Sequence, residues 1–98
     1  MVTPDALATI HFFPTEEGGR CEATPANYFG TILEYEGEFW DCRLLLEDVG
    51  SISPGQTVTV PIRFLSPGVI KPLLRVGGRF RVREMRTIAD GTIERIYL

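Results

Sequence analysis

The segment TVTVPIRF, residues 57–64, alternates strictly between apolar and polar side chains. A period of two is typical of a β-strand with one face buried, because successive side chains of an extended chain point in opposite directions. The apolar side of this strand holds Val58, Val60, Ile62 and Phe64. Pro61 has no amide hydrogen, so we expect the strand to lie at a sheet edge, or Pro61 to lie where its amide would be unpaired.

Other short segments rich in strand-forming residues follow at close spacing, at residues 7–13, 28–35, 39–46, 79–83 and 92–98. Pro54-Gly55 predicts a turn before the alternating strand, and Asp90-Gly91 predicts a tight hairpin between REMRTI and TIERIYL. Only DCRLLLEDVG, residues 41–50, has a helical pattern, and strand formers flank it. We therefore expect an all-β chain without helices.

Six or seven short strands in 98 residues predict a single domain over residues 1–98. An open antiparallel sheet of this size would leave its edges and one face poorly covered. The alternatives are a small closed barrel and a sandwich, and we favour the barrel.

The composition, with 44% hydrophobic and 23% charged residues, is typical of an ordered globular protein. The start of the chain lacks the features of a signal peptide, and its apolar runs are far shorter than the roughly 20 residues of a membrane span. We expect a soluble, cytoplasmic chain with no membrane partner. Cys21 and Cys42 are expected to be reduced thiols, and with His11 they match no zinc-binding spacing, so no metal is predicted.

The loop TEEGGRC, residues 15–21, combines two carboxylates, two glycines and an arginine. Adjacent side chains diverge, so Glu16 and Glu17 do not form a catalytic carboxylate pair. The glycines lack the Lys-Ser/Thr and the following helix of a phosphate-binding loop, and nothing in the chain pairs a nucleophile with a base. We expect a strand-ending loop whose glycines adopt unusual backbone angles and let Arg20 project from the barrel end, with no enzymatic activity and no cofactor.

Charge is divided unevenly along the chain, although the net charge is only −3. Residues 1–50 hold ten acidic and two basic side chains, and residues 51–98 hold three acidic and eight basic ones. Strand alternation predicts an arginine row on one face, made of Arg79, Arg81 and Arg83. The same alternation predicts an acidic row made of Glu34, Glu36 and Glu38.

Three interpretations of these rows remain open. The two rows can pair across neighbouring strands, where each opposite-charge pair contributes up to about 1 kcal/mol. The arginines can instead join Lys71, Arg75 and Arg86 in a patch that faces RNA phosphates or an acidic partner. The third interpretation is a solvated face without a partner.

Three segments in order, ALATIHFFPTEEGGR, SPGQTVTVPIRFLSP and RFRVREMRTIADGTI, resemble the C-terminal β-barrel of translation elongation factor Tu. They cover about 45 residues and carry that barrel's Glu-Glu-Gly-Gly-Arg loop, its Pro-Gly turn and its late Arg-Glu strand. The matching positions of the middle segment are Pro54, Gly55, Val58, Ile62 and Pro67.

The resemblance implies a closed, six-stranded antiparallel barrel without catalytic activity. In the family this barrel contacts the T-stem of aminoacyl-tRNA and packs on the neighbouring barrel and the GTPase domain. By position, Arg20 matches the loop arginine of the RNA-facing side, and Arg83 with Glu84 match the late Arg-Glu pair.

The chain departs from the family at these same places. Cys21 and Glu22 replace a His-Thr pair, which puts a carboxylate where a phosphate would approach. Phe29-Gly30-Thr31 replaces an Arg-Pro-Gln, and Met85-Arg86 replaces a glycine pair. The chain has no nucleotide-binding loop, so we expect a binding module and not a working elongation factor.

The first hypothesis is a module that binds tRNA, another RNA or a translation-related protein. Its predicted binding residues are Arg20, Arg79, Arg81, Arg83, Glu84 and Arg86. The second is a protein-interaction or self-assembly module whose exposed aromatic residues supply the contact, namely Tyr28, Phe29, Tyr35 or Trp40. A third is a small ligand in the barrel mouth beside His11 and carboxylates. The sequence predicts no particular oligomeric state.

Overall fold

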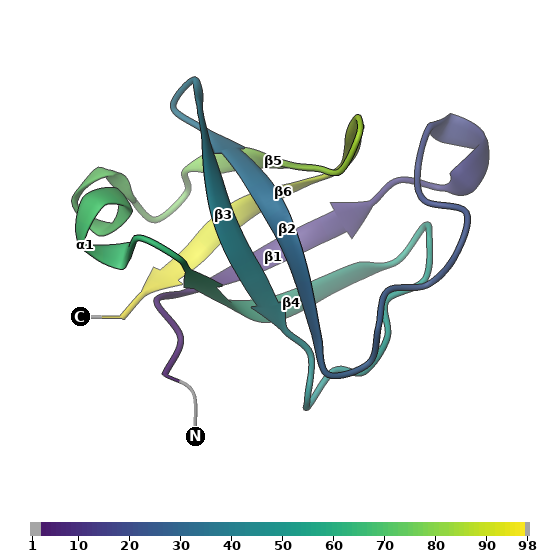
Figure 1. The fold of residues 1–98 in the computed structure, drawn as a ribbon, viewed down its shortest axis with the longest axis horizontal. Coiled ribbons are helices and arrows are strands. Elements are labelled where there is room, and N and C mark those ends of the chain that lie inside the picture. Colours follow the sequence, from purple (N-terminus) through teal and green to yellow (C-terminus); the bar gives the residue numbers. More distant parts are fainter. Residues whose placement is uncertain (1–2, 98) are drawn as a thin grey trace.

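The computed structural model describes residues 3–97 and contains six β-strands (Figure 1). They are β1 (Ala6–Phe12), β2 (Tyr28–Tyr35), β3 (Glu38–Leu45), β4 (Thr57–Phe64), β5 (Arg79–Arg83) and β6 (Thr87–Ile96). The helical elements are η1 (Thr15–Glu17), α1 (Pro67–Ile70) and η2 (Lys71–Leu73). Five strands lie within one residue of the segments that the sequence predicts, whereas β6 begins five residues before the predicted segment 92–98, whose last residue lies outside the described part of the chain.

The strands close into an antiparallel barrel with the order β1-β4-β3-β2-β5-β6. β1 pairs with β4 on one side and with the last strand, β6, on the other, which joins the two ends of the chain in one sheet. The predicted fold class, a small closed six-stranded antiparallel barrel, is confirmed.

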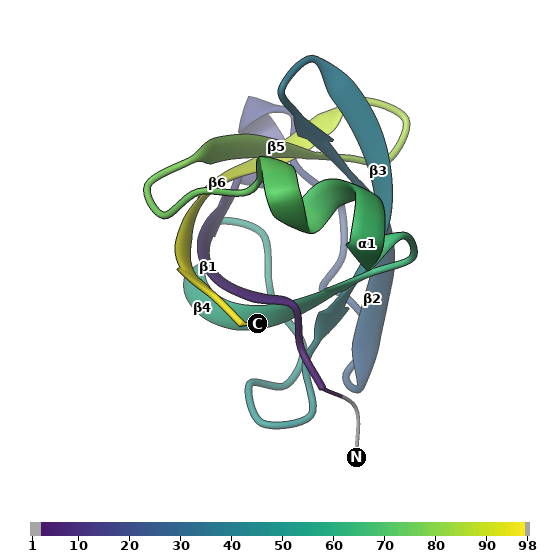
Figure 2. The ribbon, with the colours of Figure 1, turned by 90° about the vertical axis from the view of Figure 1, so that its left-hand side faces the viewer.

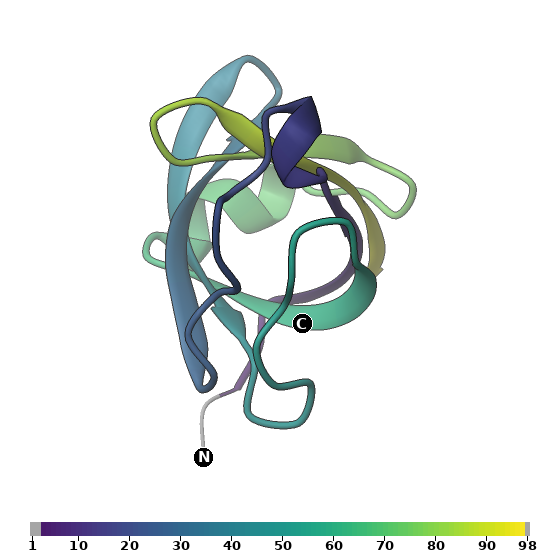
Figure 3. The same cartoon turned by 90° about the vertical axis from the view of Figure 1, so that its right-hand side faces the viewer.

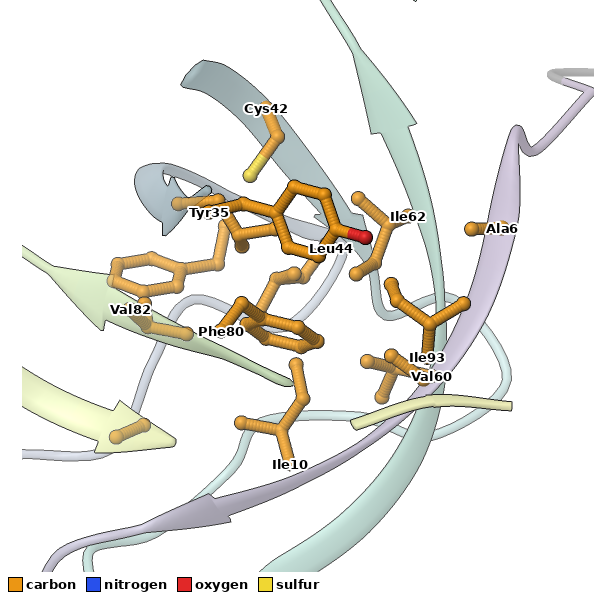
Figure 4. Close-up of a cluster of buried hydrophobic side chains, with 14 of the residues drawn as sticks. Ala6, Ile10, Tyr35, Cys42, Leu44, Val60, Ile62, Phe80, Val82 and Ile93 are labelled. Carbon is orange, nitrogen blue, oxygen red and sulfur yellow. The ribbon is translucent and has the colours of Figure 1, made fainter. Parts of the chain in front are cut away.

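The interior is filled by the inward side chains of all six strands (Figure 4). In β4, Val60 and Ile62 are fully buried, and in β5, Phe80 and Val82 are buried while the alternate arginines face outward. The predicted inward and outward faces of both strands are therefore confirmed.

Pro61 lies inside a strand that has neighbours on both sides, so the edge alternative is wrong. The register between β3 and β4 runs from Cys42–Phe64 to Leu44–Ile62 and ends there, one residue before Pro61. Pro61 therefore lies where the β3–β4 ladder has already stopped and no donor is required.

The predicted hairpin at Asp90-Gly91 is wrong. Both residues lie within β6, and the chain reverses earlier, where the Glu84 amide donates to the Arg86 carbonyl at 3.0 Å. Gly91 is opposite Phe80 of β5, and a Cβ at this position would overlap the Phe80 ring. The glycine makes room for an aromatic ring inside a strand and does not make a turn.

The expectation of a chain without helices is wrong over residues 67–73. α1 and η2 lie across one end of the barrel, as Figure 2 shows, and bury Ile70 completely. Pro67 and Pro72 each occupy an early helical position, where a missing amide hydrogen costs nothing. Residues 41–45, which have a helical pattern, belong to β3. No helix within residues 3–97 has the length and apolar character needed to cross a membrane.

Cys42 points into the core, where Figure 4 shows its sulfur, whereas Cys21 is exposed; both are free thiols. Burial, and secondarily the nearby Asp41 carboxylate, raises the pKa of Cys42 from 9.0 to about 12. The thiol is therefore neutral in the folded protein at physiological pH.

Cys42 should make stability fall at alkaline pH. Because its folded pKa is raised, the unfolded chain releases the proton first, so the contribution is complete below pH 9 and is lost as pH rises towards 12. At about pH 10 the loss is about 1.4 kcal/mol. Cys42→Ala should flatten the fall of the free energy of unfolding between about pH 8 and pH 10, measured by urea unfolding with a reductant. Equal falls in both proteins would contradict this prediction.

Candidate binding surface

Two of the predicted binding residues, Arg20 and Glu84, meet at one end of the barrel. The loop after β1 and the turn between β5 and β6 lie side by side there, as Figure 3 shows for the end opposite to α1. Arg20 Nη1 is 2.6 Å from Glu84 Oε2, and its Nε donates to the Glu22 carbonyl at 3.2 Å. The guanidinium also lies 4.8 Å from the centre of the Phe29 ring. Arg20 is half-buried and does not project freely, contrary to the sequence-based expectation.

Arg86 joins the same two segments. Its Nε and Nη2 donate to the carbonyls of Gly18 and Gly19 at 2.8 and 3.1 Å. We call this end, made of Arg20, Glu84 and Arg86 with the glycine pair, the barrel rim. The two arginines of the rim hold loops together, which leaves them less free to bind a ligand.

The glycine pair of the rim serves two different purposes. Gly18 has φ +94°, as predicted for a glycine that ends the η1 turn. Gly19 is buried, and a Cβ there would overlap the carbonyl of Phe13. Glu16 and Glu17 are exposed on η1.

The arginine row of β5 faces outward between two acidic positions. Arg81 is opposite Glu34 of β2 and opposite Asp90 of β6. Arg83 Nη1 lies 3.7 Å from Glu34 Oε1, and Arg79 and Arg81 are exposed. Three positive charges therefore lie beside two carboxylates, so the row's charge is partly compensated, although within residues 3–97 only Arg83 of the three forms an ion pair.

The predicted acidic row is broken by a turn. Glu36 and Gly37 connect β2 to β3 with φ values of 54° and 75°, and Glu38 is the first residue of β3. Glu36 instead pairs with Arg75, at 3.0 Å. Strand alternation holds only within one strand, so it could not relate residues on either side of this reversal.

The predicted aromatic contact residues are mostly internal. Phe29 and Tyr35 are buried, and Trp40 is half-buried with its ring nitrogen donating to the Tyr35 carbonyl. Only Tyr28 of that set is exposed, at 49%. Phe39, which the sequence analysis did not select, is 63% exposed.

A further outward surface lies over β2, β3 and β4 and was not predicted. Gly30 of β2 lies opposite Arg43 of β3, and a Cβ at Gly30 would meet open space. A hollow of about 510 Å³ extends from Gly30 over Arg43 to Leu65. We call this surface, which spans Tyr28, Gly30, Arg43, Arg63 and Leu65, the outer β2–β4 face. Alternation in the sequence marks Arg63 as outward, but only the register shows that Arg63 lies opposite Arg43.

His11, the single histidine of the chain, lines neither the rim nor the outer β2–β4 face. His11 Nδ1 lies 3.0 Å from Thr57 Oγ1, so the ring makes a cross-strand hydrogen bond on the outside of the barrel. Within residues 3–97, no three His, Cys, Asp or Glu side chains are grouped to hold a metal ion. The arrangement can bind another molecule through guanidinium, aromatic and aliphatic groups.

No protein-family model matches the chain, and no curated protein matches it.

The two rim glycines should differ sharply in their tolerance of a side chain. Gly19→Ala forces a methyl group against the Phe13 carbonyl and should lower the free energy of unfolding by about 2–3 kcal/mol. In Gly18→Ala the new methyl group has space, so the free energy of unfolding should fall only by the cost of a positive φ, about 1 kcal/mol. Urea unfolding of the two variants measures this, and an equal or reversed order would contradict the close approach at Gly19.

Proposed function

We propose that the chain is a non-catalytic binding module, resembling the C-terminal barrel of elongation factor Tu, and that its partner is a protein. The observation that carries the proposal is the outer β2–β4 face, where Tyr28 is 49% and Leu65 75% exposed beside the outward arginines Arg43 and Arg63. Tyrosine and arginine side chains are among those that dominate binding energy in protein interfaces, and exposed apolar groups beside them help to exclude water.

The charge distribution favours a protein over the RNA backbone. At the rim, Arg20 is paired with Glu84 and Arg86 is bound to backbone carbonyls, while Glu22 adds another carboxylate beside them. A phosphate approaching this end would have to displace or face those carboxylates. Because phosphate contacts supply most of non-specific RNA affinity, a compensated surface binds RNA weakly.

A protein partner should be lost when the outer β2–β4 face is made polar. The double variant Tyr28→Ser, Leu65→Ser should fold normally, since both side chains are largely exposed, and should fail to retain a protein that the wild type captures from an extract of its own cells. Light scattering over a concentration series shows whether the partner is a second copy of the chain.

The matched control changes exposed apolar residues of η2 and of the loop before β5, Leu73→Ser with Val76→Ser, which are 42% and 66% exposed. This control should retain the partner. Equal capture by the two double variants would contradict the assignment of the contact to the outer β2–β4 face.

RNA binding is the second candidate, favoured by Arg79 and Arg81. Both are exposed and lie on the same side of β5, and within residues 3–97 neither takes part in an ion pair. The family that the chain resembles uses its barrel to contact tRNA. Two guanidinium groups would neutralise about two phosphates, which limits the salt dependence to a logarithmic slope of about −2.

A tRNA titration across salt concentrations separates the two candidates. We expect at most weak binding that disappears at physiological salt, with a slope no steeper than about −2. Arg79→Gln with Arg81→Gln should abolish that slope, and Arg95→Gln, an exposed arginine on β6, should leave it unchanged. Tight binding with a slope steeper than about −5 would contradict the internal compensation of the arginine row.

A further inference from the structure

Two arginines face each other directly on the outer β2–β4 face. Arg43 of β3 and Arg63 of β4 are register partners, and both side chains are exposed. Directly opposed like charges destabilise a sheet, because the Cβ atoms of cross-strand partners are only about 4.5–5.5 Å apart. In the described part of the chain, neither guanidinium has a carboxylate within ion-pair distance.

The two arginines line one hollow of about 370 Å³. Its walls are Asn27, Tyr28, Arg43, Leu45, Glu47, Arg63 and Leu65. The Arg43 guanidinium lies 4.7 Å from the centre of the Tyr28 ring, which holds it over one side of the hollow. Leu65, which is 75% exposed, supplies an apolar wall. We call this hollow the Arg43–Arg63 pocket.

We propose that the Arg43–Arg63 pocket binds a carboxylate side chain from an acidic, leucine-containing segment of a protein partner. This inference rests on the proposed protein-binding function and names the chemistry of the partner. A carboxylate placed between the two guanidinium groups relieves their repulsion and accepts charge-assisted hydrogen bonds from both. An aliphatic side chain next to it covers Leu65 and the Tyr28 ring, so that charge and apolar contact select the same segment.

The surroundings of the pocket favour a single carboxylate over a polyanion. Glu47 lines the pocket itself, and Asp41 lies two residues from Arg43 on the same outward side of β3. An RNA strand would bring successive phosphates against these carboxylates, whereas one acidic side chain meets only the two arginines. The Arg43 guanidinium also covers one face of the Tyr28 ring, so a base cannot stack on that face.

Binding of a capped heptapeptide, in which glutamate and leucine alternate, tests the proposal. The titration is followed by NMR. The side-chain Nε–Hε and backbone signals of Arg43 and Arg63 should shift as the peptide is added. The matched peptide with glutamine for glutamate should bind about tenfold more weakly, since it lacks the charge-assisted hydrogen bonds. Arg63→Gln should weaken the glutamate peptide about fivefold and leave the glutamine peptide unchanged, while Arg95→Gln should change neither.

Two further readouts make the result decisive. Arg63→Gln removes a like-charge contact, so its melting temperature should equal or exceed that of the wild type, which excludes unfolding as the cause of lost binding. Equal binding of the two peptides, or no binding of the glutamate peptide, overturns carboxylate recognition. Neither outcome affects the capture experiment on Tyr28 and Leu65, which tests protein binding itself. Shifts of Arg43 and Arg63 with tRNA and not with the peptide would also overturn the proposal.

Discussion

Pairing of the first strand with the last closes this barrel, and the other contacts depend on that closure. β1 lies between β4 and β6, so residues from both ends of the chain share one ladder. Asp5, just before β1, strengthens the junction: its Oδ2 accepts from the Phe64 amide at 2.8 Å, its Oδ1 lies 3.6 Å from Lys71 Nζ, and its carbonyl accepts from the Tyr97 amide. Asp5 thus links β1 to β4 and η2 through its buried carboxylate, and to the chain beyond β6 through its backbone carbonyl.

The sequence predicted the fold well because its strongest signal is local. Alternation along a strand shows which side chains are buried, and β4 and β5 follow it closely. Local patterns fail where a residue's role depends on a distant strand. Gly91 has the sequence signature of a turn, but Phe80, which is its partner across the sheet, is the reason for a glycine there. The helical segment at 67–73 was missed because it is short and its role is to bring Ile70 to the end of the core.

The candidate site was predicted less well, for a related reason. The sequence shows that Arg79, Arg81 and Arg83 share a face, and this is confirmed, but it does not show what lies beside them. Register alone places Glu34 and Asp90 next to Arg81. Likewise, the aromatic residues of β2 alternate between the core and the surface, so Phe29 is buried while its neighbour Tyr28 is exposed. The charge and the exposure of a β-surface depend on pairing, which single-strand patterns do not contain.

The barrel's topology explains why two arginines face each other across β3 and β4. The acidic half of the chain supplies β1, β2 and β3, and the basic half supplies β4, β5 and β6. The spatial order places β2 of the acidic half beside β5 of the basic half, where Glu34 is opposite Arg81. At β3–β4 two basic residues meet instead, because Arg43, one of only two basic residues in the acidic half, lies opposite Arg63. A closed sheet also offers a partner few free strand edges, so recognition must rely on outward side chains. An uncompensated guanidinium pair on such a surface is therefore where a complementary charge has the most to contribute.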